Sequence, residues 1–326
     1  MKSVNSNWFI RARLKQRHLL VLAALGETCN LNHAAEGLSI SQPAISKLLK
    51  ELEDALGVHL FERQARGVIP TAYGETMIRH ANHLLSTLDG AYAEISAMRH
   101  GQSGRVRLGT ILTPCADLLP DTLNKVRQTH PDLEISIQTG SSEQLLEALD
   151  NGELDILVAR YFDKHDRYGF QYEPMFQEPI HVCARIDHPL IRAGRALSPA
   201  DLQHEDWVLP PDGSVMRAEF EALFYRAAML PPTRVVTAEN LLMVTNLLEQ
   251  NNMLTLLPKG VVQHYMRYNM LTQVTLTQGV QKALDRNLAP YGLIVRDEHL
   301  LAPAAKAVLE ILRRAGNNPY EGKVRV

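Results

Sequence analysis

Cysteine is scarce in this chain: its 326 residues include only Cys29, Cys115 and Cys183. An odd number at long spacings offers neither a disulfide framework nor the paired spacing of a zinc site. Long apolar runs are also missing, because none reaches the roughly 18 residues of a membrane-spanning helix. Trp8-Phe9-Ile10 is too short for the core of a signal peptide. We therefore expect no metal, no membrane partner and a cytoplasmic location.

Catalytic signatures are missing as well. The thirteen histidines are dispersed, and the chain has no His-Glu-x-x-His motif, no phosphate-cradling glycine-rich loop and no nucleophile elbow. His181 and Cys183 would share one face of an expected strand, as a dyad, as half a metal site or, more simply, as a buried core pair. We expect no catalytic residues and no cofactor, so the sequence does not predict an enzyme.

The net charge of −2 hides an uneven distribution. Residues 1–71 contain nine Lys and Arg against six Asp and Glu, whereas the rest of the chain contains 25 against 30. A basic end on an otherwise acidic chain suits a DNA-binding segment joined to a larger part that avoids non-specific sites.

Residues 31–74 carry the strongest positive signal, because they read as two short helices, a basic hairpin and the start of a long helix. Ser41 is a suitable N-cap whose hydroxyl would accept a backbone N–H, and Pro43 fits the first helical turn. Apolar residues then recur at i, i+3, i+4 and i+7, which buries one face: Ile45, Leu48, Leu49 and Leu52. The opposite face is either an ordinary solvated surface or a set of contacts to base edges and phosphates: Ser41, Gln42, Pro43, Ser46, Lys47 and Lys50.

A small wing is expected next. Val58–Arg63 and Val68–Thr71 read as two strands, and Pro70 suits an edge. Arg63 and Arg66 would project toward the DNA backbone or the minor groove, unless the hairpin is simply solvated. A helix that enters the major groove beside such a wing predicts sequence-specific binding to double-stranded DNA.

A long helix is expected from Thr71 to His100, which lacks proline and has glycine only at positions 74 and 90. At 1.5 Å per residue it would be about 40 Å long, too long for a small winged domain to bury. Its apolar residues alternate between spacings of 4 and 3, as in a coiled-coil seam: Met77, Ala81, Leu84, Leu88, Ala91, Ile95 and Met98. We expect the last five of these residues to pair with a second copy of the chain rather than pack only on their own chain.

Several short motifs occur in order along residues 34–71: Ala34-Ala35, Leu38, Ser41-Gln42-Pro43-Ala44-Ile45-Ser46, Leu52-Glu53, Leu56-Gly57, Leu60-Phe61-Glu62-Arg63, Arg66-Gly67 and Pro70-Thr71. In this order they resemble the winged helix-turn-helix of LysR-type transcriptional regulators. The resemblance implies that the helix after Ser41 is the recognition helix and that the long helix pairs two domains on inverted half-sites. It also implies a tetramer and contact with RNA polymerase. Two residues depart from the pattern: Ser39 stands where glycine is common, which disfavours a left-handed turn, and Pro70 stands where leucine is frequent.

Strands and helices alternate after residue 101, which is typical of a parallel α/β sheet. Strands are expected at Arg105–Ile111, Leu133–Thr139, Leu154–Ala159 and Tyr291–Arg296, with helices at Leu118–His130, Ser142–Asn151 and Pro303–Arg314. The pattern resumes through Ile180–Ala184, Glu219–Met229, Val235–Thr237, Ala238–Gln250 and Met253–Leu257. The motifs Gly152-Glu153-Leu154-Asp155-Ile156 and His188-Pro189-Leu190 resemble the LysR-type effector domain, which is similar to periplasmic solute-binding proteins.

The predicted fold class is therefore α/β, in three parts. Residues 1–72 form the winged helix-turn-helix, 73–101 the linker and dimerisation helix, and 102–326 a two-lobed, periplasmic-binding-protein-like effector domain. Lobe I would comprise about 102–178 and 285–326, and lobe II about 179–284. The resemblance implies a small-molecule effector between the lobes that modulates transcription.

Ligands of open α/β sheets bind beyond the carboxyl ends of strands, and this rule nominates the effector contacts: Thr110, Thr113, Gly140, Ser141, Ser142, Arg160, Asp212, Ser214 and Asn240. Ser141 and Ser142 either offer N–H groups to an anion or cap a helix. Arg160 either faces the cleft, which would favour an organic anion as effector, or forms a structural ion pair at the hinge. Cys115 is either a redox-sensing thiol or, more simply, an inert one.

Overall fold

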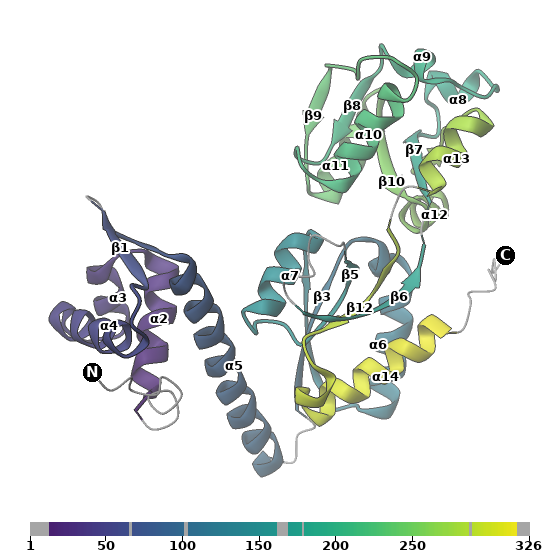
Figure 1. Ribbon diagram of the computed structural model, residues 1–326. Coiled ribbons are helices and arrows are strands. Elements are labelled where there is room, and N and C mark those ends of the chain that lie inside the picture. The colour runs from purple at the N-terminus through teal and green to yellow at the C-terminus, as the bar shows by residue number, and fades with distance from the viewer. Residues whose placement is uncertain are drawn as a thin grey trace. The chain divides into compact units, whose positions relative to one another are not determined.

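The computed structural model describes residues 13–64, 67–100, 104–161, 169–177, 179–286 and 289–317 (Figure 1). The N-terminal winged domain contains α2 (Gln16–Thr28), α3 (Leu31–Gly37), α4 (Gln42–Leu56), β1 (Phe61–Gln64) and β2 (Gly67–Pro70). Its core contains the fully buried side chains of Leu22 and Leu25 from α2, Ile45 and Leu52 from α4, and Leu60 just before β1. The helix α3 adds two buried alanines.

Local sequence signals set the ends of these helices. The Asn30 side chain accepts two backbone N–H groups at the start of α3, and Gly57, with φ of 72°, ends α4. Ser39 has φ of 54°, so the left-handed turn before α4 forms without glycine. Ser41 is the N-cap of α4, but its side chain accepts no capping hydrogen bond from the described residues. The predicted role of its hydroxyl was therefore wrong.

The wing is an antiparallel pair in which Phe61 faces Pro70. The sequence predicts a first strand from Val58, but the strand begins at Phe61. The N–H groups of Leu60 and Phe61 donate to the Glu53 side chain of α4 rather than to a neighbouring strand. Pro70 is the last residue of β2, and in a two-stranded sheet both strands are edge strands, as predicted for this proline. Arg66 lies outside the described residues.

The predicted long helix is present as α5 (Ala72–His100). It starts directly against the wing, because a Cβ on Gly74 would lie 2.0 Å from the carbonyl oxygen of Leu60. Further along, Ser86 donates a hydrogen bond to the carbonyl of Gly152, and a Cβ on Gly152 would lie 2.8 Å from Cβ of Ser86. Gly152 has φ of 77°, so both backbone conformation and space require glycine there.

The rest of the chain forms two lobes, each built on a five-stranded sheet. Lobe I has strand order β4-β3-β5-β12-β6, and lobe II has order β11-β7-β10-β8-β9. The strands of lobe I are β3 (Arg105–Thr110), β4 (Glu134–Thr139), β5 (Ile156–Arg160), β6 (Gln171–Phe176) and β12 (Tyr291–Val295); its helices are η1 (Thr113–Ala116), α6 (Leu118–Thr129), α7 (Ser142–Asp150), η3 (Glu298–Leu300) and α14 (Pro303–Asn317).

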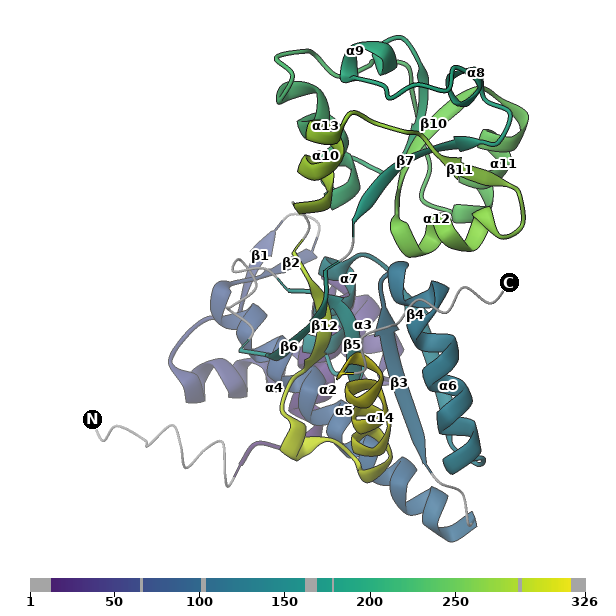
Figure 2. The ribbon, with the colours of Figure 1, turned by 90° about the vertical axis from the view of Figure 1, so that its right-hand side faces the viewer.

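Lobe II is covered by helices on both faces of its sheet (Figure 2). Its strands are β7 (Ile180–Arg185), β8 (Asp206–Leu209), β9 (Val235–Thr237), β10 (Met253–Pro258) and β11 (Leu271–Gln273); its helices are α8 (Pro189–Arg192), α9 (Pro199–Leu202), α10 (Val215–Tyr225), α11 (Leu241–Gln250), α12 (Lys259–Met266) and α13 (Gln278–Arg286). Alternate residues of β7 serve the two faces: Val182 packs with Phe220 of α10 and Leu284 of α13, whereas Cys183 packs with Val244 of α11 and Val261 of α12.

The α/β class is as predicted, but both sheets are mixed where the alternation of strands and helices predicted a parallel sheet. β3 runs parallel to β5, but β12 is antiparallel to both β5 and β6. In lobe II, β8 is parallel to β9 and β10, whereas β7 is antiparallel to β10 and β11. The antiparallel strands lie where the chain enters lobe II or returns to lobe I, and such a crossover changes strand direction without changing the local apolar pattern.

Candidate DNA-binding and effector-binding sites

The recognition helix α4 has the two faces that its sequence predicts. Ile45 and Leu52 are fully buried in the winged-domain core, so the inner face is confirmed. On the other side Gln42 and Ser46 are half-buried, and the Gln42 Nε2 donates to the Ser46 Oγ over 3.0 Å. This bond orients the Gln42 amide toward its neighbour. The remaining predicted DNA contacts of this helix are exposed: Ser41, Pro43, Lys47 and Lys50.

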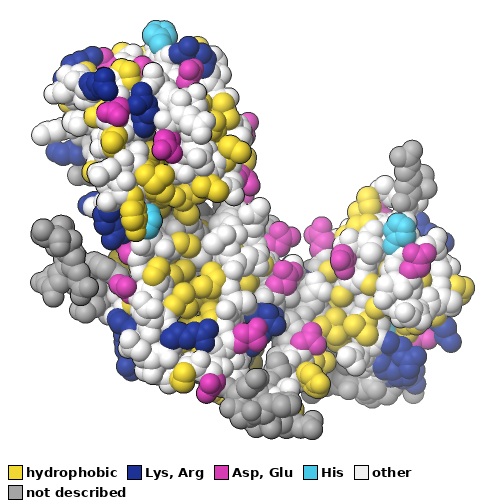
Figure 3. Space-filling model, turned by 180° about the vertical axis from the view of Figure 1, so that it is seen from behind, with side chains coloured by type: hydrophobic (Ala, Val, Ile, Leu, Met, Phe, Trp, Pro, Cys, Tyr) yellow, Lys and Arg dark blue, Asp and Glu magenta, His cyan; other side chains and the backbone are white. Residues whose placement is uncertain are grey.

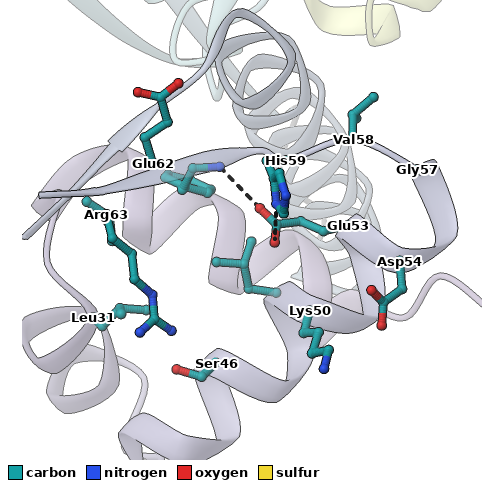
Figure 4. Close-up of a pocket in the computed structure, with 13 residues that line it drawn as sticks. Leu31, Ser46, Lys50, Glu53, Asp54, Gly57, Val58, His59, Glu62 and Arg63 are labelled. Carbon is teal, nitrogen blue, oxygen red and sulfur yellow. Dashed lines mark hydrogen bonds and ion pairs between the residues drawn. The ribbon is translucent and has the colours of Figure 1, made fainter.

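A groove of about 1040 Å³ lies between α4 and the wing (Figure 4). Ser46 and Lys50 reach it from the helix and Arg63 reaches it from β1, so three of the predicted DNA contacts meet there. Carboxylates line the same groove, among them Glu53 and Glu62. The groove therefore offers hydroxyl, ammonium and guanidinium donors, with acidic groups close to them.

A second hollow of about 280 Å³ joins Gln42 and Arg63 to the start of α3. Asn30, Asn32 and Gln64 also line it, and the sequence analysis did not select these residues. Their signal was weak, because an Asn before a helix predicts a cap, which is the role the Asn30 side chain has. On the face of the molecule shown in Figure 3, acidic and basic side chains are interspersed.

The heptad seam of α5 divides into two halves. Ala81 is buried and Met77 half-buried in the winged-domain core. Further along, Leu84, Leu88 and Ile95 are 45%, 52% and 60% exposed, and Ala91 is also exposed. The side chain of Met98 lies outside the described residues. The described side chains of the later half thus form an apolar stripe on one helix face.

In lobe I the nominated residues lie close together at the strand ends. Gly140 N donates to Thr110 O over 3.2 Å, and Arg160 N donates to the Ser142 Oγ over 3.2 Å. Thr110 is fully buried and its hydroxyl donates to the carbonyl of Ile111. Thr113 is also buried, in η1. The Ser141 hydroxyl accepts from Gln144 N, so Ser141 caps α7.

Arg160 is 6% exposed at the end of β5. Its Nε donates to the carbonyl of Ala289 over 3.2 Å, and its guanidinium lies 6.0 Å from the ring centroid of Tyr291. Burial raises the pKa of the nearby Tyr172 hydroxyl, while the positive charge of Arg160 acts in the opposite direction. A buried guanidinium at the end of a strand is the strongest anion-binding group among the nominated residues of this lobe.

In lobe II the nominated residues have structural roles. Ser214 caps α10 by accepting from Arg217 N, and Asn240 caps α11 by accepting from Met243 N. Asp212 is exposed, and its carboxylate lies 3.2 Å from the Arg217 Nε. The sequence analysis missed Arg217, because an arginine in the first turn of a helix carries no distinctive signal.

The three cysteines differ in exposure: Cys29 is exposed, Cys115 is half-buried and Cys183 is buried. Burial raises the pKa of Cys115, although a hydrogen bond with Thr110 lowers it in part. Cys183 is fully buried, and burial raises its pKa far above the ordinary value. Within the described residues, no group of three His, Cys, Asp or Glu side chains is arranged to hold a metal ion. The same residues include no helix with the length and apolar content needed to cross a membrane.

Known families match most of the chain. Residues 16–75 match the bacterial regulatory helix-turn-helix protein, lysR family, and residues 99–317 match the LysR substrate binding domain. The HTH-type transcriptional regulator GbpR of Azospirillum brasilense is 36% identical over 312 residues, which cover 96% of this chain and 90% of GbpR. The HTH-type transcriptional regulator PcaQ of Agrobacterium fabrum is 28% identical over 313 residues, 95% of this chain and 98% of PcaQ.

Solved structures share the fold. Full-length CbnR complexed with its target DNA has a TM-score of 0.59 at 24% identity, covering 93% of this chain and all of CbnR. ArgP from Mycobacterium tuberculosis has a TM-score of 0.68 at 15% identity, covering 94% of this chain and 98% of ArgP. Together with the matched domains, these relatives place a DNA-binding winged helix-turn-helix before a two-lobed effector-binding domain: the chain belongs to the LysR family of HTH-type transcriptional regulators.

Proposed function

We propose that two copies of the chain pair through the exposed half of the α5 seam and set two recognition helices on inverted half-sites of promoter DNA. Base edges would be contacted by short groups at the start of α4, and phosphates by the lysines and wing arginines. The base contacts are Ser41, Gln42, Pro43 and Ser46, and the phosphate contacts are Lys47, Lys50, Arg63 and Arg66. The observation that carries this proposal is the meeting of Ser46, Lys50 and Arg63 on one groove.

The effector is proposed to be a small organic anion bound by lobe I and lobe II. Thr110, Thr113, Gly140, Ser141, Ser142 and Arg160 would contribute from lobe I, and Asp212, Ser214 and Asn240 from lobe II. The buried Arg160 guanidinium supports an anionic ligand. Binding would change the geometry of the paired DNA-binding domains, and with it the contact to RNA polymerase. A tetramer in the cytoplasm completes the proposal.

A pair of substitutions separates base recognition from phosphate contact. On duplexes enriched from a random library by the full chain, Gln42→Ala should relax base preference, because it removes an amide donor and acceptor. Lys50→Ala should weaken all duplexes alike and lower the slope of log K against log salt by about 0.9 per lost phosphate contact. Lys125→Ala, at an exposed lysine of α6, is the matched control. Equal weakening on every duplex for Gln42→Ala would contradict its role in base recognition.

A further inference from the structure

We propose that Glu53 is a positioning residue for DNA binding. Its carboxylate binds the base of the wing, residues 59–61, to the recognition helix. It thereby fixes Arg63 against the DNA backbone. The inference deepens the proposed function and depends on the Arg63–phosphate contact proposed there.

The Glu53 side chain bridges two elements of the winged domain (Figure 4). It leaves the last turn of α4, where its Oε1 accepts the N–H of Leu60 over 2.7 Å and the N–H of Phe61 over 3.3 Å. Its Oε2 lies 3.5 Å from the His59 Nδ1. The Glu53 side chain is only 16% exposed, whereas that of His59 is 86% exposed. Water therefore screens the contact with His59 more than the two hydrogen bonds from the backbone.

The position of Glu53 on its own helix is unfavourable. The C-terminal end of a helix carries partial negative charge, which repels a carboxylate in the last turn. A carboxylate that is mostly withdrawn from water also loses free energy unless donors replace the water. The N–H groups of Leu60 and Phe61 supply those donors. A carboxylate at this position is therefore explained by its hydrogen bonds to Leu60 and Phe61, because it does not stabilise α4.

The same short stretch is held from its other side by the start of α5. The Thr71 hydroxyl donates to the carbonyls of His59 (2.8 Å) and Leu60 (3.2 Å), and Thr71 N donates to Leu60 O over 2.9 Å. With its N–H groups bound by Glu53 and its carbonyls by Thr71, the base of the wing has a fixed orientation.

Arg63 lies two residues beyond this base. Side chains two apart on a strand share a face, and Phe61 and Arg63 both line the groove beside α4. β1 has only four residues, so a shift at Leu60 and Phe61 is passed directly to the guanidinium. Glu53 itself would repel phosphates in this groove, so its contribution to DNA binding has to come through position rather than charge.

Two substitutions of Glu53 separate charge from reach. The full chain is titrated with a 40-bp random-sequence duplex, and the slope of log K against log salt counts phosphate contacts. Glu53→Asp keeps the charge but is one methylene too short, so the slope should fall by about 0.9 per bound subunit, as for Arg63→Ala. Glu53→Gln loses the charge but keeps an acceptor oxygen at the same reach, so it should retain the wild-type slope. Asp54→Asn, on the same groove, is the charge-matched control and should also leave the slope unchanged.

A double substitution tests whether Glu53 acts through Arg63. Glu53→Asp should lower the slope no further in an Arg63→Ala background, because the wing contact is already lost. A further fall there would overturn the proposal, as would a wild-type slope for Glu53→Asp or a lowered slope for Glu53→Gln in protein that melts like wild type. A wild-type slope for Arg63→Ala alone would instead reject the wing contact on which the proposal depends, while leaving DNA binding by α4 intact.

Discussion

A single buried imidazole begins helix α8. The Nδ1 of His188 accepts the N–H of Leu190 over 3.2 Å, and His188 is 1% exposed. An accepting nitrogen carries no proton, so this contact requires the neutral ring. Burial is the main reason why the pKa of His188 is lowered, against the opposing influence of a hydrogen bond with the backbone of Asn252 and of the charge of Glu205. The folded state therefore disfavours protonation at this position.

Lobe II should accordingly lose stability in mild acid. A histidine whose folded pKa lies below its unfolded value stabilises the fold above the unfolded pKa of about 6.5, and this stability is lost as the pH falls below it. The loss is at most about 1.4 kcal/mol per pH unit for one proton. The measurement is the midpoint of urea-induced unfolding of lobe II, compared between pH 7.5 and pH 5.5. In a Trp8→Phe background, the fluorescence of the buried Trp207 reports this unfolding.

The substitution His188→Asn is the control for this pH dependence. Asparagine can cap a helix without titrating, so the midpoint of lobe II unfolding should fall less between pH 7.5 and 5.5. Part of the dependence should remain, because burial also lowers the pKa of His181 in the same lobe. An identical acid response in His188→Asn and wild type would show that His188 does not contribute.

Single residues near strand ends also show where sequence interpretation stops. Ser141, Ser214 and Asn240 were chosen as effector contacts, and each caps the helix that follows its strand. A cap and a ligand contact use the same short polar side chain at the same position, so the sequence cannot separate them. Arg217 was missed for the opposite reason, since its role depends on Asp212 and on its guanidinium lying over the ring of Phe220.

At the scale of elements, local patterns were predicted better than pairings. The heptad spacing and the absence of proline predicted α5, and the structure confirms a helix over Ala72–His100. In contrast, β6 (Gln171–Phe176) has no fully buried residue and β11 (Leu271–Gln273) is only three residues long. Neither strand has a local signal, because each is defined by its neighbours in the sheet.

The exposed half of the α5 seam makes a prediction about assembly. Leu88→Asp would place a charge in the stripe of each partner helix and remove the burial of a leucine, which is about 1.5–3 kcal/mol per side chain. Two such losses weaken association by at least roughly 100-fold, so sedimentation at micromolar concentration should show the assembly at half its wild-type mass. Gly90→Asp adds the same charge two residues along, where an added Cβ would meet nothing within 4 Å beyond its own helix, and should leave the mass unchanged. Equal masses for both variants would mean that α5 does not pair through this stripe.

For the whole molecule, the two-part architecture could be predicted because each part has its own periodicity. The helix-turn-helix motifs are contiguous, as Ser41-Gln42-Pro43 illustrates, and the α/β alternation is regular. The mixed direction of both sheets could not be predicted in the same way. In lobe I it depends on β12, which lies between β5 and β6 in the sheet but far from both of them in the sequence. No local pattern encodes such a pairing.

The proposed effector site combines residues of lobe I and lobe II that are far apart in the sequence. A thermal-shift screen of the full chain tests effector binding. A ligand at 100 times its Kd stabilises the folded state by about 2.7 kcal/mol, roughly 2–4 °C or more in melting temperature for a domain of this size. Because Arg160 is buried and cationic, small carboxylates and sugar acids should raise the melting temperature whereas neutral sugars should not. Arg160→Ala should abolish the shift, while Arg192→Ala, an exposed arginine paired with Asp187, should retain it. A carboxylate shift that survives Arg160→Ala would remove Arg160 from the site, and a shift from neutral sugars alone would replace the anion with a polyol as the effector class.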